Sequence, residues 1–336
     1  MKLGVIGLGY WGPNLLRNLL SIPKTDVIGC DSNVKRLNLI KGKFPNAKYT
    51  KDYRDLLNKD KVDGVLISTP LKSHYKLAKI FLENGIDVFV EKPMTASVKE
   101  AEELISLSEE GKRILMVGHT FVFNPAVIKI KDIIDSGEIG EVYYITSTRV
   151  NLGIHRRDAN VIWDLAPHDF SVIFSWIDSK PKYVSAVGKD AVLNGIPDVA
   201  FIHTIFEDGV ISDIQVSWLA PSKIRRTIIV GSKKMIVYND IDPREKVKVY
   251  DSGVDLKEPY DYGEFLLTYR VGDIRSPKID NREPLKIEIE HFLECIKTRS
   301  KPASDGYAGL KVVKTLEMAD KSLVENGKVL FFKKGV

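Results

Sequence analysis

The chain has 336 residues, 44% of them hydrophobic and 28% charged, which is typical of a globular protein with about two domains. Lysine and arginine (50) barely exceed aspartate and glutamate (45), and the basic residues are interspersed with acidic ones, so the pattern does not indicate nucleic-acid binding. No run approaches the roughly 18 apolar residues of a membrane helix, and the N-terminus lacks the apolar region of a signal peptide. We therefore expect a cytoplasmic protein that binds neither nucleic acid nor membranes.

Short apolar segments alternate with amphipathic ones over residues 1–123. The amphipathic segments include 72–84 and 97–110, which end at Gly85 and Gly111 as helices do. The apolar segments are almost continuously hydrophobic, as parallel strands covered on both faces are; they are 2–7, 26–31, 63–69, 87–92 and 113–119. The alternation predicts an α/β fold that begins with a Rossmann domain, a doubly wound parallel sheet, over residues 1–123.

From about residue 124 the pattern changes to alternating apolar and polar residues. Five segments have it: 142–150, 183–190, 199–206, 210–218 and 224–231. Such alternation predicts a large, open, mostly antiparallel sheet with one exposed face. Helical patterns at 285–298 and 304–325 and a terminal GKVLFF follow. We expect an α+β domain over residues 124–336 for substrate binding and oligomerisation, with the last helix and strand packing back between the domains.

The N-terminal segment GVIGLGYWGPNLL contains Gly7-x-Gly9-x-x-Gly12. The motif leaves a predicted strand and opens a predicted helix, which is the context of a dinucleotide-binding loop. Gly7 would make the tight turn, Gly9 would leave room for a pyrophosphate, and Gly12 would let the helix pack on the strand. The pyrophosphate would lie at the positive N-terminus of the helix.

An acidic residue ends the second predicted strand, 19 positions after Gly12. This residue, Asp31, can accept hydrogen bonds from the ribose hydroxyls of NAD and would repel the 2′-phosphate of NADP. Lys35 and Arg36 follow closely and are able to accommodate a phosphate. The pattern favours NAD and leaves NADP as the alternative.

The segment STPLKSHY follows the strand predicted at 63–69. Ser68, Thr69 and Pro70 would border the crevice at the carboxyl end of the sheet, where ligands of such folds bind. His74 is open to two interpretations, an exposed residue in the first turn of a helix or a cofactor contact.

The strand predicted at 87–92 ends on two charges, Glu91 and Lys92, followed by Pro93. Charges at a buried strand end are costly unless they are paired or used. Lys92 could stabilise a developing alkoxide or relay its proton, and Glu91 could hold Lys92 in place. A charge pair that only caps the strand is the alternative. The Lys92–Pro93 bond is a candidate for the cis form.

A second cluster lies in NVIWDLAPHDFSVIFSW, where Asp164 and His168 are spaced to share one face of a helix. Pro167 predicts that they lie in the first turn of that helix. His168 is suited to take a hydroxyl proton, with Asp164 or Asp169 to orient it. A structural histidine at a helix start is the alternative. Two metal ligands without a third do not indicate zinc, and the distant Cys30 and Cys295 are expected to be buried and unpaired.

Three segments together resemble the glucose–fructose oxidoreductase, inositol dehydrogenase and MocA family: GLGYWG, the EKP tripeptide and WDxxxHD. The resemblance covers nearly the whole chain. It implies Lys92, Asp164 and His168 as active-site residues, a nicotinamide cofactor held between the domains, and dimer or tetramer contacts through the open sheet. It also implies cofactor contacts by Tyr10 and Trp11 of the glycine motif and by Glu91 and Lys92.

Within that family, residues 151–173 look most like the nucleotide-sugar 3-dehydrogenases, which oxidise C3 of UDP-N-acetylglucosamine or of its uronic acid. Arg156 and Arg157 could bind a phosphate or carboxylate, or form a solvated loop. Trp163 could line the nicotinamide pocket or belong to the core, and Asn124 could reach either ligand. A dehydrogenase or reductase of a free sugar or inositol, and a non-catalytic NAD-binding regulator, are the alternative functions. Whether Lys92 or His168 is the base stays open.

Overall fold

The computed structural model describes residues 1–57, 62–157, 159–257 and 266–333. Two compact units form the chain. The first comprises Met1–Phe123 and Arg282–Lys314, and the second comprises Asn124–Asn281 and Thr315–Val336. In the described part of the chain, no helix is both long and apolar enough to cross a membrane.

The first unit contains a parallel sheet of six strands in the order β3-β2-β1-β4-β5-β6, which is the order of a dinucleotide-binding fold. This confirms the predicted fold class. The strands are β1 (Lys2–Ile6), β2 (Asp26–Cys30), β3 (Lys48–Thr50), β4 (Gly64–Ile67), β5 (Asp87–Glu91) and β6 (Leu115–Gly118). Strand β3 was not predicted, because its three residues, Lys-Tyr-Thr, carry no apolar run.

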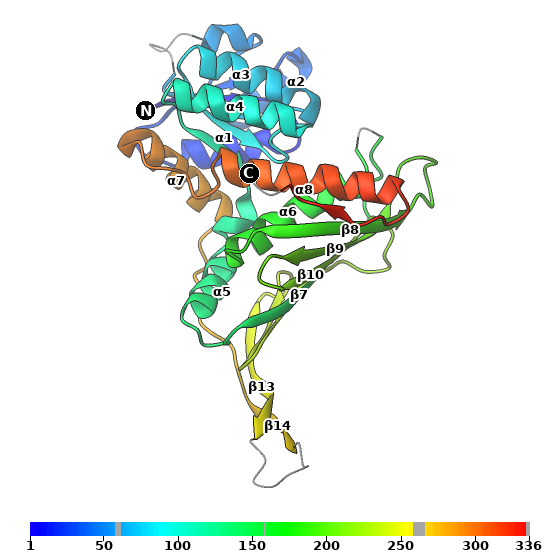
Figure 1. The fold of residues 1–336 in the computed structure, drawn as a ribbon. Helices are drawn as coiled ribbons and strands as arrows, with labels where there is room; N and C mark the ends of the chain where they lie inside the picture. The colour runs from blue at the N-terminus through cyan, green and yellow to red at the C-terminus, as the bar shows by residue number, and fades with distance from the viewer. Residues whose placement is uncertain (58–61, 158, 258–265, 334–336) are drawn as a thin grey trace. The chain divides into compact units, whose positions relative to one another are not determined.

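Helices cover both faces of this sheet (Figure 1). Helices α3 and α4 pack against each other on one face, while α1 and α7 pack together on the other. The helices of the unit are α1 (Gly12–Leu20), α2 (Val34–Lys43), α3 (His74–Glu83), α4 (Val98–Glu110) and α7 (Pro284–Thr298). Short 3-10 turns η1 (Tyr53–Leu56), η2 (Leu71–Ser73) and η3 (Thr120–Phe123) complete its connections.

Residues 282–314 differ from the expected division of the chain, which placed everything after residue 123 in the second domain. The reason is hydrophobic: α7 supplies Ile289 and Phe292, both with no exposed surface, to the core formed with β1, β5 and α1. The Phe292 ring lies edge-on to Phe89 of β5, with centroids 5.7 Å apart. The first unit is therefore assembled from both ends of the chain.

The second unit contains a sheet of nine strands in the order β14-β13-β12-β11-β7-β10-β9-β8-β15. Its strand pairs are antiparallel except β7 and β10, which run parallel. The strands are β7 (Val142–Val150), β8 (Pro181–Lys189), β9 (Val199–Phe206), β10 (Ile211–Ser217), β11 (Ile224–Gly231), β12 (Met235–Asn239), β13 (Val247–Lys257), β14 (Leu266–Arg275) and β15 (Leu330–Phe331). Five of these strands agree with the predicted segments to within two residues at either end.

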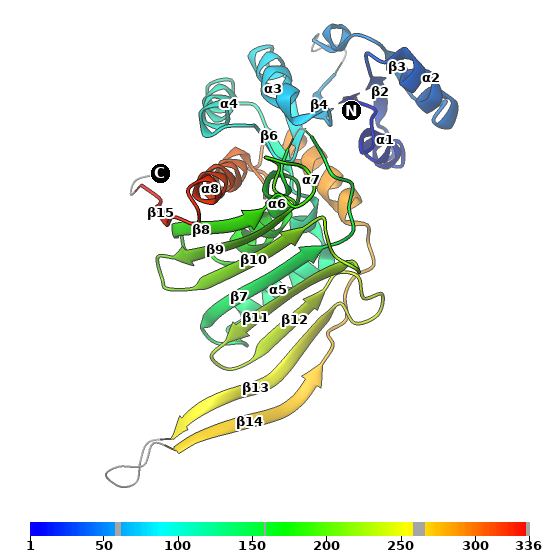
Figure 2. The same ribbon diagram turned by 90° about the vertical axis from the view of Figure 1, so that its right-hand side faces the viewer.

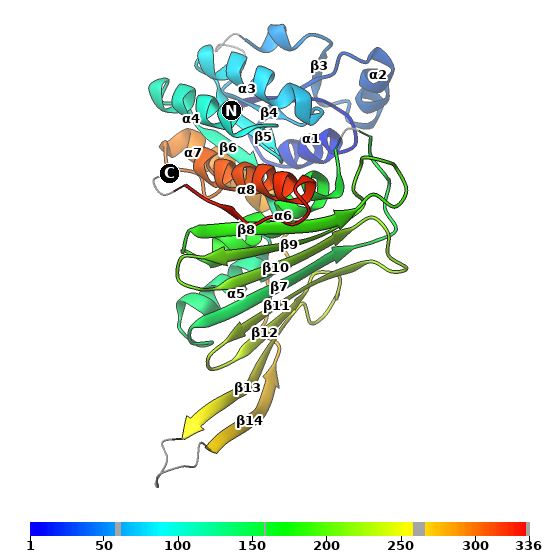
Figure 3. The same ribbon diagram turned by 45° about the vertical axis from the view of Figure 1, so that its right-hand side comes forward.

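One face of this sheet is covered by helices α5 (Pro125–Asp135) and α6 (Val161–Trp176), as Figures 2 and 3 show. Helix α6 packs on β7, β9 and β10, and α5 packs on α6. The end of α8 (Gly306–Val324) joins the unit through Ser322, whose hydroxyl accepts the backbone N–H of Ala186 at 2.9 Å. On the opposite face, side chains such as Phe201 and Ile211 remain more than a third exposed.

Candidate active site

The glycine motif forms the turn between β1 and α1. Gly7 has a φ of +90°, a conformation that favours glycine. A β-carbon at Gly12 would lie 2.0 Å from the carbonyl oxygen of Gly7, so this position admits no side chain. A β-carbon at Gly9 would meet no atom within 4 Å. The protein itself thus leaves space at Gly9, and this space fits the pyrophosphate of a dinucleotide.

Asp31, directly after β2, is tied to the glycine turn. Its Oδ2 accepts the backbone N–H of Leu8 and its Oδ1 accepts that of Asn33, both at 2.8 Å. The carboxylate is therefore fixed beside the turn that would hold the dinucleotide. Lys35 and Arg36, on α2, are exposed.

The segment after β4 also contacts the glycine turn. The Ser68 hydroxyl donates to the carbonyl oxygen of Gly7 at 2.7 Å, and the Thr69 hydroxyl accepts from Ser73 at 2.7 Å. Pro70 is exposed and precedes the short turn η2. Because β1 and β4 are neighbouring parallel strands, both segments lie at the same carboxyl edge of the sheet.

His74 differs from the expectation of an exposed residue, since only 2% of its surface is accessible. Its Nδ1 lies 2.9 Å from the carbonyl oxygen of Pro93 and its Nε2 lies 2.7 Å from that of Thr69. His74 therefore connects the segment after β4 with the turn that carries Lys92. Burial is the main cause that lowers the pKa of His74.

Lys92 lies at the same edge, directly after β5. The Lys92–Pro93 bond is cis, as the sequence suggested. The side-chain Oε2 of Glu91 accepts the backbone N–H of Lys92 at 3.3 Å, so the Glu91 carboxyl group lies beside the main chain of Lys92. Burial raises the pKa of Glu91 to about 7, which brings its carboxyl group into the neutral range.

Two buried titratable residues next to this turn were missed in the sequence. His119 follows β6 and is 2% exposed, and burial together with the charge of Lys92 lowers its pKa to about 3. Glu288, on α7, has no exposed surface and accepts the Thr120 hydroxyl on Oε2 at 2.7 Å. The apolar pattern of β6 and the spacing of buried residues on α7 carry no signal for either residue, because their burial depends on contacts distant in sequence.

Helix α6, in the second unit, carries the predicted Asp164 and His168. It begins at Asn160, whose side chain accepts the backbone N–H groups of Ile162 and Trp163. The prediction that Pro167 marks the first turn is wrong, because Pro167 lies inside the helix. The strong cap at Asn160 moves the start of the helix six residues upstream, and the proline removes one helical donor there.

The Asp164 carboxylate has a fixed orientation within the second unit. Its Oδ1 accepts a hydrogen bond from Arg156 at 3.1 Å, and its Oδ2 accepts one from the Trp218 indole at 3.0 Å. The Trp218 ring in turn packs edge-on against His155, with centroids 5.4 Å apart. Arg156, predicted as a phosphate or carboxylate contact, thus binds a carboxylate of the protein itself.

Two other predicted site residues of this unit, Asp169 and Asn124, form hydrogen bonds within the fold instead of facing a ligand site. Asp169 is buried and binds Arg149 at 2.7 Å and Ser147 at 2.8 Å, which directs it to the sheet rather than to His168. Asn124 caps α5 by accepting the Ala126 N–H and is 6% exposed, so its amide is engaged in the fold. Arg157 is exposed, and Trp163 and His168 are partly buried.

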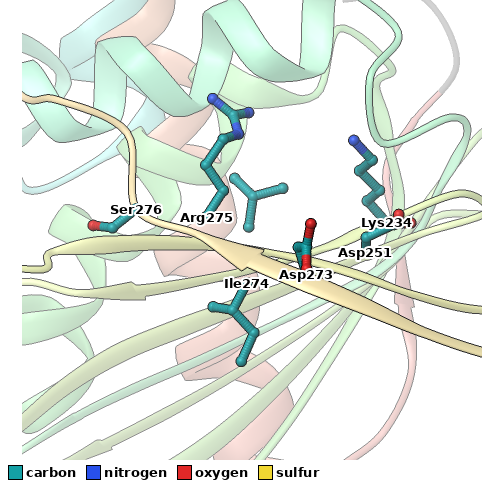
Figure 4. A pocket seen from close by; sticks show the side chains of 7 residues that line it. Lys234, Asp251, Asp273, Ile274, Arg275 and Ser276 are labelled. Carbon is teal, nitrogen blue, oxygen red and sulfur yellow. The ribbon is translucent and has the colours of Figure 1, made fainter.

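A surface hollow elsewhere in the second unit contains none of the predicted site residues (Figure 4). It is lined by Lys234, Val249, Asp251, Asp273, Ile274, Arg275 and Ser276. Its two cations both bind Glu138, at 3.2 Å from Lys234 and 2.7 Å from Arg275. Both cations of the hollow are thus paired within the protein.

The described residues contain no cluster of three or more histidine, cysteine, aspartate or glutamate side chains arranged for a metal ion. Cys30 and Cys295 are buried and unpaired, as expected. Burial raises the pKa of the Cys30 thiol to about 12, which makes it a poor nucleophile at neutral pH.

The fold and the glycine turn after β1 define a dinucleotide-binding protein, and the comparisons agree. Residues 1–119 match the model for the oxidoreductase family with an NAD-binding Rossmann fold, and residues 127–237 match the GFO/IDH/MocA C-terminal domain. The chain belongs to the Gfo/Idh/MocA oxidoreductase family and is an NAD-binding protein.

Two curated proteins and two solved structures are similar to the chain along most of its length. The chain is 26% identical to the UDP-N-acetylglucosamine 3-dehydrogenase of Acidithiobacillus ferrooxidans, over 93% of this chain and 94% of that protein. The structure of that enzyme superposes with a TM-score of 0.79, covering 96% of this chain and 97% of the other. The scyllo-inositol 2-dehydrogenase (NAD(+)) of Bacillus subtilis is 25% identical over 90% and 88% of the two chains. GenD2 from gentamicin A biosynthesis, solved with NAD, has a TM-score of 0.82 at 19% identity, covering 99% and 96%.

Proposed function

We propose that this NAD-binding oxidoreductase oxidises a sugar ring hydroxyl at the CH–OH carbon, most specifically C3 of a UDP-N-acetylhexosamine or of its uronic acid. The observation that carries the substrate assignment is the likeness to UDP-N-acetylglucosamine 3-dehydrogenase along more than nine-tenths of both chains. The chemistry is supported by Lys92 at the carboxyl edge of the sheet that holds the glycine turn.

Gly7, Gly9 and Gly12, with Asp31, would hold NAD, supported by Tyr10, Trp11, the Ser68–Pro70 segment and Trp163. NAD supplies the hydride acceptor for the sugar carbon. The hydroxyl proton is taken by His168 or Lys92, and the cation of Lys92 stabilises negative charge on the oxygen. Asp164, already oriented by Arg156 and Trp218, positions His168 or a sugar hydroxyl. Arg157, an exposed cation, is proposed to contact the anionic part of the substrate.

A substrate panel tests the assignment. UDP-N-acetylglucosamine, its uronic acid, glucose and myo-inositol would each be incubated with the protein and excess NAD⁺, with and without 2-oxoglutarate, and NADH formation would be followed by absorbance. In the arm with 2-oxoglutarate, its consumption reports recycling of a retained cofactor. The Lys92→Ala variant serves as the control for contaminating activity. Turnover of a UDP-sugar alone supports the proposal.

A free sugar or inositol is the second candidate substrate, and the likeness to scyllo-inositol 2-dehydrogenase favours it specifically. Turnover of myo-inositol or glucose alone would replace the nucleotide sugar and keep the roles of Lys92 and His168. NAD binding without turnover of any of the four compounds would favour the third candidate, a non-catalytic regulator.

We also propose that the open face of the nine-stranded sheet joins copies of this chain into a dimer or tetramer. This face carries an apolar row in register across three strands, formed by Ile205, Ile211 and Tyr144. Tyr144 and Ile211 are 41% and 46% exposed. Apolar area of this kind on a sheet face is typical of a protein interface.

A further inference from the structure

The interior of the first unit contains an unusual group of polar side chains beside Lys92. Glu91 ends β5, His119 follows β6, and Glu288 comes from α7. Among the described residues, four of their polar atoms are buried without a hydrogen-bond partner in the protein: Glu91 Oε1, both His119 ring nitrogens and Glu288 Oε1. Buried polar atoms are costly when unsatisfied, and several in one place indicate that water satisfies them.

The three residues are linked by one short segment. In the register of β5 and β6, Glu91 lies opposite Gly118, and a β-carbon at Gly118 would come within 3.0 Å of the Glu91 Cδ and Oε2. Glycine at this position therefore makes room for the Glu91 carboxyl. Two residues further, the Thr120 hydroxyl donates to Glu288. Residues Gly118 and Thr120 thus lie against the two acids, and His119 stands between these two residues in the sequence.

We propose that a water site lies among Glu91, His119 and Glu288, and that through it a neutral Glu288 stabilises the charge of Glu91, which takes up a proton leaving Lys92. This inference rests on the proposed dehydrogenase function for the role of the proton. Glu288 is in this scheme a positioning residue, since it acts through Glu91.

The proton transfer balances without a further reactant. Oxidation of the alcohol sends a hydride, with two electrons, from carbon to the nicotinamide, and leaves the hydroxyl proton. When that proton reaches Lys92, the ammonium N–H bond breaks and an O–H bond forms on Glu91, so a cation and an anion become two neutral groups. Release of the Glu91 proton to solvent then restores the carboxylate, and Lys92 is again the neutral amine that accepts the next hydroxyl proton.

The charged groups around the pair agree with these protonation states. Burial and the negative charge of Glu91 raise the pKa of Glu288 well above its usual range, which favours its protonated form, while the Thr120 hydrogen bond opposes this effect. Lys92 favours the ionised form of Glu91, and burial keeps His119 neutral. One turn along α7, burial also lowers the pKa of His291. At the start of α7, Glu283 is paired with Arg17 at 2.5 Å.

Two substitutions at Glu288 separate this scheme from a merely structural role. Glu288→Gln keeps the shape, the neutrality and a hydrogen-bond donor, so we expect turnover and its pH profile to stay near those of the unmodified protein. Glu288→Leu removes the donor, so the ionised form of Glu91 loses support. The midpoint of the rise of kcat with pH, expected near pH 7 from Glu91, should then move up by about one pH unit. At pH 7 this corresponds to a loss of up to about tenfold in kcat, with an unchanged KM for NAD⁺.

The matched control is Glu294→Leu, on the same helix, where the side chain is 59% exposed. It should leave the pH profile unchanged. An unchanged profile in Glu288→Leu, or an equal loss in Glu288→Gln and Glu288→Leu, would overturn the inference.

Infrared spectroscopy tests, without any substrate, whether the Glu288 carboxyl group carries a proton. At pH 7 the protein should show the carbonyl band of protonated carboxyl groups; Glu288→Gln should lose the Glu288 part of this band and leave only the part from Glu91, whereas Glu294→Gln should leave the band unchanged. Absence of this band from the unmodified protein overturns the inference even if Glu288→Leu does not fold. If no compound of the panel is oxidised, the dehydrogenase assignment fails, and the band alone then supports or overturns the buried site.

Discussion

The indole N–H of Trp218 donates a hydrogen bond of 3.0 Å to the Asp164 carboxylate. Trp218 directly follows β10, and its backbone N–H donates to the carbonyl oxygen of Asp198 at 2.9 Å. The sheet thereby fixes the orientation of a carboxylate that belongs to helix α6. The role proposed for Asp164, positioning His168 or a sugar hydroxyl, depends on such a fixed orientation, because misplacement by about 1 Å is enough to slow a reaction about 100-fold.

Loss of the hydrogen bond between Trp218 and Asp164 should lower kcat clearly and the free energy of unfolding only slightly. We expect Trp218→Phe to lower kcat about tenfold and to cost about 1 kcal/mol of unfolding free energy. The matched control is Trp176→Phe, because the Trp176 indole donates to the Val127 carbonyl oxygen at 3.0 Å. The control should lose similar stability in urea unfolding but keep its kcat. Equal kcat values in the two variants would contradict the role of Asp164.

Removal of Lys92 or His168 should slow hydride transfer itself. In single-turnover experiments with a substrate of the panel, we expect Lys92→Ala and His168→Ala each to lose at least about 100-fold in rate, because general acid–base catalysis contributes about that much. Lys76→Ala, which removes an exposed lysine of α3, is the control and should react normally. Normal rates in both active-site variants would refute the mechanism.

Two glycines of one turn should respond oppositely to alanine. Gly9→Ala places a β-carbon in open space, so the unfolding free energy should change by less than about 0.5 kcal/mol while NAD⁺ affinity falls. Gly12→Ala forces a β-carbon to within 2.0 Å of the Gly7 carbonyl oxygen, so it should destabilise the fold itself. Thermal unfolding and calorimetric titration with NAD⁺ would measure both effects. A destabilised Gly9→Ala variant with normal affinity would contradict the assignment of the pyrophosphate site.

The choice of cofactor should depend on Asp31. We expect Asp31→Ser to weaken NAD⁺ binding about tenfold and to reduce discrimination against NADP⁺, since it removes a negative charge and the acceptor of the Leu8 amide. Asp26→Ser, at the exposed start of the same strand, is the control. Binding constants for both nucleotides would be compared, and an unchanged ratio in Asp31→Ser would remove this residue from the cofactor site.

The open sheet face should control assembly. The double variant Phe201→Glu/Ile211→Glu places two charges on the proposed interface, and we expect it to reduce the molar mass measured by light scattering. Ile128→Glu alters a residue that is 42% exposed on α5 and should leave the mass unchanged. If the unmodified protein and the double variant have the same mass, this face is not the interface.

Five strands of the parallel sheet were predictable because they are short apolar runs bounded by glycines and helical patterns, whereas β3 has no such run. The second sheet was predictable only in part: β13 and β14 contain Gly253 and Gly272 and many polar residues, so their alternation is weak. The glycine turn and Lys92 follow from local motifs, and so do the expectations for Asp31. Glu288 and Trp218 could not be predicted, because their contacts join segments that are far apart in sequence.

The assembly of the first unit from two chain segments has a consequence for synthesis. Residues 1–123 leave the ribosome long before Arg282–Lys314, so the emerging sheet lacks the apolar side chains of α7 that complete one of its faces. The nucleotide-binding unit can reach its final packing only after Asn124–Asn281, the larger part of the second unit, has been translated. A segment made late in synthesis, Arg282–Lys314, therefore determines when the first part of the chain is finished.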